Sequence, residues 1–320
     1  MNHSTSTVAV GLALSLAMSA AWAQEPTTAS VAQTGAGNQA YVEQRSAGER
    51  ATISIVQSGN NNLIGDPAGR TGGVLMSETA AMIVEISQSG NANQLTLRHH
   101  EGGFFGFSYI NQSGTGNIAS LMQNGAYEST IRVEQHGERN MIDDRVEGSG
   151  ALSFRPSQYG SGNVITTRRI QSGYAGLPIY QDGSDNRATV TYDNAFYSGI
   201  GIRQTGTGNE ARGSMAWTGF ATDAYISQDG AGNLAVTDIR ESGGASTTQT
   251  GNANSAAVSQ YTGSNGATVI QTGTLNTASV TQSGPWSLTP NVASITQIGE
   301  GFVAGITQTG SANSAGIHQH

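Results

Sequence analysis

The sequence predicts an all-β protein, a β-solenoid of about 13 stacked strand-turn-strand repeats of ~23 residues each. Three observations lead to this fold: one hexapeptide recurs along the chain, its flanks alternate between apolar and polar residues, and charge is scarce. Only 11% of the 320 residues are charged and 6% are aromatic, whereas 44 are Gly. An ordinary globular enzyme has about 25% charged residues. The composition therefore does not fit a conventional globular enzyme.

The first segment has the pattern of an export signal. Residues 8–21 form an uncharged, largely apolar run, and Ala21-Trp22-Ala23 follows as a small-x-small site. A short apolar run before such a site is typical of a secretory signal peptide. A membrane anchor needs about 20 apolar residues. We therefore expect residues 1–23 to be removed and the mature chain to be exported without a membrane span.

The hexapeptide Gln-x-Gly-x-x-Asn recurs from residue 33 to residue 313. A defective copy has Gln297 and Gly299 but Phe302 in place of Asn, and it precedes the last copy by only 11 residues. The complete copies are Gln33-Gly35-Asn38, Gln57-Gly59-Asn62, Gln88-Gly90-Asn93, Gln112-Gly114-Asn117, Gln135-Gly137-Asn140, Gln158-Gly160-Asn163, Gln181-Gly183-Asn186, Gln204-Gly206-Asn209, Gln228-Gly230-Asn233, Gln249-Gly251-Asn254, Gln271-Gly273-Asn276 and Gln308-Gly310-Asn313. Such recurrence is the signature of a repeat architecture.

The flanks of the hexapeptide predict two strands in each repeat. An aliphatic residue usually stands two positions before the Gln, as at Ile55, Ile110 and Val269. After the Asn, the pattern Ala-x-aliphatic-x-Gln ends at Gln44, Gln123, Gln260, Gln282 and Gln319. Alternation with period two indicates strands with one buried face. The Gly and Asn between them tolerate positive φ, which predicts a tight turn.

Stacking of such repeats explains why polar residues stand at inward positions. One unit alone is too small to be stable in water, but each stacked unit covers the face of its neighbour. Gln then lies over Gln and Asn over Asn, so that the amides bond along the stack. We expect the motif Gln and Asn residues, together with the five later Gln residues, to form amide ladders that stabilise the assembly. The twelve motif Gly residues are expected to form the turns.

The pattern Ser-x5-Gln-x-Gly-x-x-Asn-x-Ala-x3-Gln resembles that of curlin repeats. The resemblance extends over residues 33–319, almost all of the mature chain. It implies a component of curli, the extracellular functional amyloid with which Gram-negative bacteria adhere and build biofilm matrix. The implied partners are other copies of this chain, other curlin-type subunits, a secretion pore in the outer membrane and periplasmic accessory proteins.

Some features depart from the curlin pattern. The chain has more repeats than the familiar curli subunits, and inserts interrupt it at 65–80 and 284–291. Pro156 stands at an inward strand position, where its missing N–H is expected to weaken one rung. We divide the chain into a signal peptide (1–23), an N-terminal segment (24–32) and a solenoid (33–320).

Charge divides the predicted solenoid into a charged half, 33–245, and an uncharged half, 246–320. All Arg residues lie between 45 and 240, and no charged residue occurs from 246 to 299. Charges discourage edge-to-edge pairing of strands, whereas uncharged Gln/Asn-rich segments favour it. One hypothesis is that the uncharged half assembles fast, and Asp in place of Ser259 or Thr281 would then lengthen the assembly lag. The alternative is that the charges only solvate outward faces.

The sequence gives little indication of chemistry. His318 and His320 would share one strand face without a third metal ligand, and Asp143-Asp144 is more typical of a turn than of a calcium site. No catalytic residues, cofactor or metal are expected, and a net charge of −8 argues against a nucleic-acid partner. Two alternatives to a fibre subunit stay open: a monomeric secreted β-solenoid adhesin, and a nucleator or cap of curli fibres.

Overall fold

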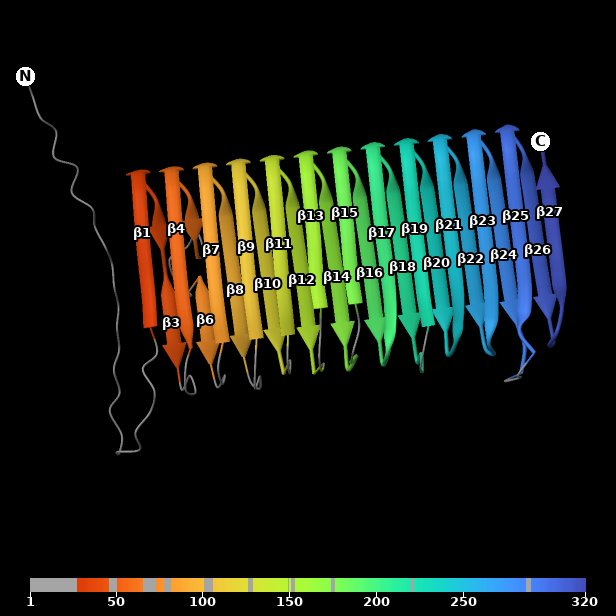
Figure 1. Ribbon diagram of the computed structural model, residues 1–320, viewed down its shortest axis with the longest axis horizontal. Coiled ribbons are helices and arrows are strands. Elements are labelled where there is room, and N and C mark those ends of the chain that lie inside the picture. The colour runs from red at the N-terminus through yellow and green to blue at the C-terminus, as the bar shows by residue number, and fades with distance from the viewer. Residues whose placement is uncertain are drawn as a thin grey trace, which may run out of the picture.

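The computed structural model describes residues 28–45, 51–65, 73–77, 82–100, 106–125, 129–148, 150, 153–173, 176–219, 222–285 and 289–320. Among these residues it contains only strands, turns and irregular segments, and the strands form two parallel sheets. The strands lie side by side in chain order along one stack (Figure 1). The predicted all-β solenoid fold is therefore confirmed. The predicted signal peptide, 1–23, lies outside the described residues.

The first sheet contains the strand that precedes each motif Asn from Asn38 to Asn276, and it ends with two further strands. Its thirteen strands pair in chain order. They are β1 (Thr28–Ala36), β4 (Thr52–Asn60), β7 (Met82–Asn91), β9 (Gly106–Thr115), β11 (Ser129–Glu138), β13 (Ser153–Ser161), β15 (Gly176–Ser184), β17 (Ser198–Thr207), β19 (Thr222–Ala231), β21 (Gly243–Asn252), β23 (Asn265–Thr274), β25 (Asn291–Glu300) and β27 (Ser314–Gln319).

The second sheet contains the strand that follows each motif Asn from Asn38 to Asn276, and it ends with the strand that precedes Asn313. Its first two rows are each divided into two short strands, and the remaining rows are single strands. The strands are β2 (Gln39–Ala40), β3 (Val42–Arg45), β5 (Leu63–Ile64), β6 (Val74–Ser77), β8 (Gln94–His100), β10 (Ile118–Asn124), β12 (Met141–Glu147), β14 (Val164–Ile170), β16 (Arg187–Asp193), β18 (Glu210–Ala216), β20 (Leu234–Arg240), β22 (Ser255–Tyr261), β24 (Thr277–Ser283) and β26 (Val303–Thr309).

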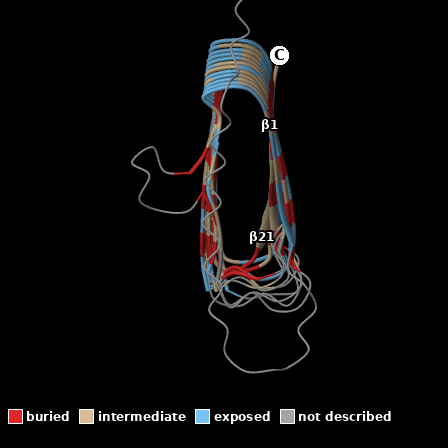
Figure 2. Cartoon of the chain, turned by 90° about the vertical axis from the view of Figure 1, so that its left-hand side faces the viewer, coloured by how far each residue is buried: buried red, intermediate tan, exposed pale blue. Residues whose placement is uncertain are grey.

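Side chains alternate between the interior and the surface along each strand. In β23, for example, Ala267, Val269 and Gln271 are buried, whereas Thr268 and Ile270 are exposed. The two sheets face each other along the whole stack, with buried residues on both walls (Figure 2). Because successive strands pair in register, each inward side chain lies over the equivalent residue of the next rung. The core is therefore a set of parallel columns of equivalent residues.

Pro156 interrupts the first sheet at the position predicted from the sequence. It is buried in β13, where the pairing with β15 is continuous from Ser153 to Ser161. On the β11 side the pairing is interrupted at Arg155 and Pro156. Sequence analysis missed a second interruption at Pro178, where the pairing of β15 with β17 is absent between Gly176 and Ile179.

The first insert divides one strand of the second sheet. Ile64 of β5 pairs with Leu95 and Val74 of β6 pairs with Leu97, both in β8. The chain thus leaves the sheet after Ile64 and re-enters it at Val74. The second insert lies between β24 and β25. Residues 66–72, 78–80 and 286–288 of the two inserts are outside the described part of the chain.

Candidate functional site

One continuous ladder of Gln side chains runs through the first sheet. Each Gln donates from Nε2 to Oε1 of the next Gln, over distances of 2.6 to 2.9 Å. From Gln57 to Gln297 these side chains are at least 99% buried. The ladder consists of Gln33, Gln57, Gln88, Gln112, Gln135, Gln158, Gln181, Gln204, Gln228, Gln249, Gln271, Gln297 and Gln319.

The second hydrogen of these amides connects the two sheets. Nε2 of Gln57 donates to the carbonyl oxygen of Gln39, 3.1 Å away, and Nε2 of Gln271 donates in the same way to Ser255, 2.9 Å away. Each acceptor lies directly after a motif Asn in the second sheet. A buried amide is costly unless its hydrogen bonds are made. The ladder meets this requirement by bonding along the stack and across the interior.

The motif Asn residues form a second, parallel ladder at the turn. Asn117, for example, donates from its backbone N–H and from Nδ2 to Oδ1 of Asn93, both over 3.1 Å. Its Nδ2 also donates to the carbonyl oxygen of Gly137 in the next rung, 3.0 Å away. The column runs Asn38, Asn62, Asn93, Asn117, Asn140, Asn163, Asn186, Asn209, Asn233, Asn254 and Asn276, and it ends at Phe302.

The predicted reason for the motif Asn needs a correction. Positive φ occurs at the motif Gly and at the residue just before the Asn, as in Gly90 (96°) and Ala92 (55°). The motif Asn residues themselves do not have positive φ. Their role is instead to form hydrogen bonds along the stack through their side chains. The motif Gly is required because its neighbour is so close: a Cβ on Gly114 would lie 2.0 Å from the carbonyl oxygen of Gly137.

Among the described side chains, a second Gln ladder occurs in the last rungs of the second sheet alone. Nε2 of Gln260 donates to Gln282 over 2.9 Å, and Nε2 of Gln282 donates to Gln308 over 2.7 Å. Gln260 belongs to a column of inward residues that stack in register along the second sheet, and the earlier members of this column are mostly not Gln. In chain order it reads Gln44, Met76, His99, Gln123, Val146, Arg169, Tyr192, Met215, Ile239, Gln260, Gln282 and Gln308. Gln44 is described in its backbone alone.

The position of Gln308 corrects the register expected from the sequence. We expected Gln308 to begin one more repeat in the same column as Gln33. It lies instead in β26 of the second sheet, and the Gln of the defective copy, Gln297, occupies the first column. Gln319 then stacks on Gln297. The last motif is therefore half a turn out of phase with the other motifs.

A matching Asn column stands at the opposite turn of the last rungs. Nδ2 of Asn291 donates to Oδ1 of Asn265, and Nδ2 of Asn313 donates to Oδ1 of Asn291, each over 3.0 Å. Nδ2 of Asn291 also donates to the carbonyl oxygen of Gly310 over 2.7 Å. Near the C-terminal end, Gln and Asn side chains therefore form ladders in both half-repeats. In the earlier described rungs, they form ladders in one half-repeat of each turn.

In the middle of the stack, Arg169 occupies the inward column of the second Gln ladder and forms an ion pair with Asp144 of the neighbouring inward column. Both side chains of the Asp144–Arg169 ion pair are fully buried, and Nη2 of Arg169 donates to the two carboxylate oxygens of Asp144 over 2.5 and 2.6 Å. Thr167 donates to Asp144 as well. Phe154 packs on the guanidinium, 5.0 Å from Cζ to the ring centre. Asp143-Asp144 therefore lies within β12, which corrects our reading of it as a turn, and Asp144 neutralises a buried cation.

His99 is a second buried ionisable group that sequence analysis did not assign to the interior. Its Nε2 lies 3.4 Å from Oγ of Ser108, and burial lowers the pKa of the imidazole to about 4. Burial also raises the pKa of Tyr192, whose hydroxyl accepts a hydrogen bond from the N–H of Ile200 over 2.6 Å. The alternation pattern could have identified these positions, since each lies two residues after an inward apolar residue.

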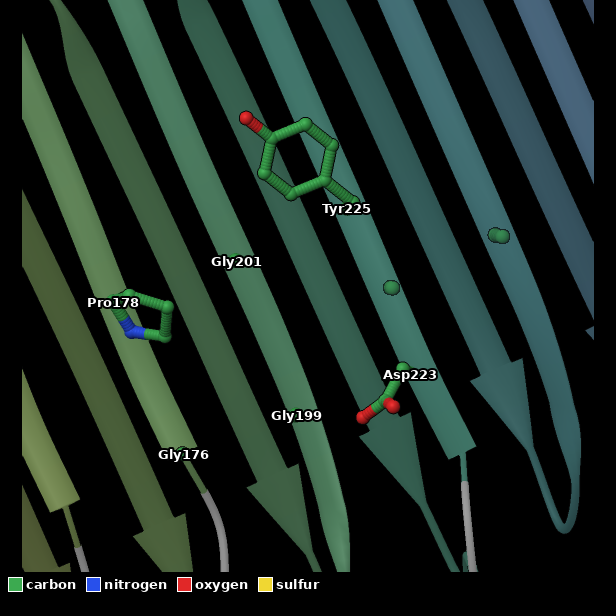
Figure 3. A pocket seen from close by; sticks show the side chains of 8 residues that line it. Gly176, Pro178, Gly199, Gly201, Asp223 and Tyr225 are labelled. Atoms are coloured by element: carbon green, nitrogen blue, oxygen red, sulfur yellow. The ribbon is translucent and has the colours of Figure 1, made fainter.

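The outer surface offers little for catalysis. Among the described residues no group of three or more His, Asp or Glu is placed to hold a metal ion. The rings of His318 and His320 lie 5.1 Å apart. A shallow hollow on the first sheet arises because Gly199 and Gly201 leave space beside Pro178 (Figure 3), and one carboxylate, Asp223, lines it together with Gly176, Ala224, Tyr225 and Ala245.

Both ends of the stack have strand edges without a partner among the described residues. β1 and β27 are the terminal strands of the first sheet, and β26 is the last strand of the second. Val303 of β26 is 72% exposed. Five hydrophobic residues of the end rungs are partly buried against the core: Val31, Ala40, Val42, Ala315 and Ile317. These half-covered residues and the unpaired edges form two candidate assembly surfaces.

One protein family matches the chain, in a region that contains both Gln ladders. The curlin associated repeat family matches residues 244–273 and 251–284. Residues 244–284 are thus similar to curlin repeats. The match covers β21 to β24 and confirms the resemblance seen in the sequence. The curated proteins contain no match to this chain. The described residues contain no helix long and apolar enough to cross a membrane.

Proposed function

We propose that this chain is a structural subunit of an extracellular curli-type amyloid fibre, exported by a Gram-negative bacterium for adhesion and biofilm matrix. Curlin repeats are structural rather than enzymatic, and they are typical of extracellular curli. The single observation that carries the proposal is that the amide ladders end at open strand edges. Gln33 at one end and Gln319 at the other have a ladder neighbour on one side only within the described chain.

The mechanism follows from these open ends. An unfolded chain that meets the end of the stack pairs its backbone with the exposed edge, as in strand addition to a sheet. Its Gln and Asn side chains then extend the ladders, because the amides bond preferentially to identical neighbours one rung away. Each rung that forms recreates the same surface. Self-templating of this kind accounts for the Gln, Asn and Gly of the motif as structural residues.

Other parts of the proposal rest on the sequence pattern. Export would use residues 1–23 as the signal peptide, and passage through the curli pore would occur before folding. The partners would be further copies of this chain and other curlin-type subunits. The functional division into a restrained charged half (33–245) and a fast-assembling uncharged half (246–320) is supported by the double ladder, which among the described side chains occurs in the last rungs.

The test is seeded assembly of the mature chain, residues 24–320. Denatured protein is diluted into buffer with and without preformed fibres, and thioflavin-T fluorescence is followed. A lag that seeds remove, together with fibres that diffract at ~4.7 Å, supports a self-propagating subunit. A soluble β-rich monomer without a rise in fluorescence would contradict the proposal and favour the monomeric adhesin. Fibre growth only when a second curlin is present would favour a nucleator or cap.

A further inference from the structure

The first and the last strand of the described chain lie in the same sheet. β1 and β27 both belong to the first sheet, and the second sheet ends one strand earlier, at β26. The stack therefore contains half a turn more than a whole number of turns. This half turn is the structural counterpart of the 11-residue step between Gln297 and Gln308. It determines how two copies can be joined.

Joining two copies in the same orientation leaves a gap. Suppose that β1 of the next copy paired with β27 of the preceding copy. Then β2 and β3 of the next copy would lie two rungs from β26 of the preceding copy, instead of beside it. The edge of β26, Val303–Thr309, would then face an empty strand position. Backbone N–H and C=O groups that are buried without partners destabilise a structure strongly, so this junction would interrupt the fibre at every subunit.

We propose that successive copies in the fibre are rotated by half a turn about the solenoid axis. β1 of the next copy then pairs with β26, and β2 and β3 of that copy pair with β27. This inference rests on the proposed function as a fibre subunit. The rotation fills every strand position, and the path of the chain continues through the junction without a gap.

The residues at the two ends match in this arrangement. The motif Gln308-x-Gly310-x-x-Asn313 meets Gln33-x-Gly35-x-x-Asn38 of the next copy, so that one complete motif stacks on another. The inward residues of β26 meet those of β1, and the inward residues of β27 meet those of β2 and β3. The matched pairs are Ala304 with Ala29, Ile306 with Val31, Ala315 with Ala40, and Ile317 with Val42.

The hydrogen-bonding groups at the ends are complementary as well. Every ladder Gln donates toward the C-terminal end, so Gln308 presents Nε2 there and Gln33 presents a free Oε1 at the other end among the described residues. In the Asn column, the hydrogen bonds that Asn Oδ1 accepts are donated in the opposite direction, from each Asn to the Asn of the preceding rung. Asn313 presents Oδ1, which the backbone N–H of Asn38 in the next copy can reach as Asn313 itself reaches Asn291. The junction would continue both ladders.

Charge does not oppose this contact. Residues 28–42 and 301–320 contain no Asp, Glu or Arg, and Glu43 of β3 would stand in register with His318 rather than with an acidic residue. The hydrophobic residues that the junction would cover are the partly buried Val31, Ala40, Val42, Ala315 and Ile317. Val31, Ala40 and Val42 belong to the first rung of the next copy. Ala315 and Ile317 belong to the last strand of the preceding copy. The two surfaces thus differ from each other, which favours a head-to-tail contact that can repeat without closing.

Disulfide cross-linking in fibres tests the rotation. Outward positions are used, and the described residues include no Cys that would compete. A half-turn places Thr307 beside Ala32 of the next copy, whereas an unrotated junction places His318 beside Ala32. Residues paired on adjacent strands lie about 4.8 Å apart, within the Cα range of a disulfide. The variants are Ala32→Cys/Thr307→Cys and, as the matched control, Ala32→Cys/His318→Cys.

Each double variant is assembled with wild-type seeds under reducing conditions and is then oxidised. We expect covalent multimers in denaturing gels from Ala32→Cys/Thr307→Cys and monomers from Ala32→Cys/His318→Cys. Cross-links in the second variant alone, or in neither variant despite normal fibres, would overturn the half-turn junction while leaving the fibre function intact. Absence of fibres from the wild-type chain would instead overturn the proposed function.

Discussion

Gln282 donates a hydrogen bond from Nε2 to Oε1 of Gln308, 2.7 Å away, in the second sheet. It also accepts one from Gln260 over 2.9 Å and donates to the carbonyl oxygen of Gly266 over 3.1 Å. In the same column, Met215 lies between Tyr192 and Ile239. The column therefore provides an amide environment around Gln282 and a largely apolar environment around Met215.

We expect Gln282→Met and Met215→Gln both to destabilise the protein, although they are reverse exchanges. Gln282→Met leaves Oε1 of Gln308 and the carbonyl oxygen of Gly266 without their donor, and Met215→Gln buries an amide among apolar neighbours. Each change should cost about 1–3 kcal/mol. Amide hydrogen exchange gives the local free energy of opening. Equal protection of wild-type and Gln282→Met in β22, β24 and β26 would contradict the importance of the second ladder.

The turn Gly residues should differ in their tolerance of Ala. A Cβ on Gly114, where φ is +107°, would lie 2.0 Å from the carbonyl oxygen of Gly137. Gly208 has φ of +63° and no atom within 4 Å of such a Cβ. Gly208→Ala is expected to cost about 1–2 kcal/mol for the left-handed backbone alone. Gly114→Ala should lower the urea midpoint considerably more, because the two rungs must also separate; equal midpoints would contradict this.

The sequence predicted the fold and the first ladder because both depend on local periodicity. Alternation identifies which residues of β23 are inward, and the repeated Gln identifies what stacks on Gln271. It did not predict the phase of Gln308, because two similar half-repeats allow two registers and only the pairing of β26 with β24 decides between them. The buried partner of Arg169 was also missed, since Asp144 is an entire rung away in sequence.

The Asp144–Arg169 pair is expected to be costly to break and easy to replace. Asp144→Ala leaves a buried guanidinium without its anion, which typically costs 3–5 kcal/mol. Replacing both residues by apolar ones, as in Asp144→Val/Arg169→Met, removes both charges. Val and Met already occur in the same columns, at Val190 and Met215. The double variant should therefore regain most of the thermal stability that Asp144→Ala loses. A double variant as unstable as Asp144→Ala would contradict this account.

His99 should make stability depend on pH. Burial lowers the pKa of His99 from 6.5 to about 4 in the folded protein. Because the unfolded chain binds the proton more readily, the stability is complete above pH 6.5 and falls as the pH decreases toward 4. At 1.36 kcal/mol per pKa unit, the loss approaches about 3 kcal/mol. His99→Gln should lose less stability over this range, which urea unfolding at a series of pH values measures. If the stability of the wild type and of His99→Gln fell equally with decreasing pH, this role of His99 would be contradicted.

Added charge near the C-terminal end should slow assembly in a position-dependent way. Ser259 is paired with Asp238 on one side and with Thr281 on the other, whereas Thr281 lies between Ser259 and Thr307. Asp at position 259 would therefore stand beside a like charge, which destabilises a cross-strand pair by about 0.2–1 kcal/mol. Asp at position 281 has no charged neighbour in its column but lies one strand from the open edge of β26.

We therefore expect Thr281→Asp to lengthen the thioflavin-T lag with little loss of stability, and Ser259→Asp to lengthen the lag and lower stability together. Asn and Asp have nearly the same shape, so Thr281→Asn is the matched control and should assemble faster than Thr281→Asp. Raised salt should shorten the lag of both Asp variants toward that of the wild type, since exposed charges are screened. Equal lags for Thr281→Asp and Thr281→Asn would mean that charge does not restrain assembly, and the charges of the first half would then act only as solvated surface residues.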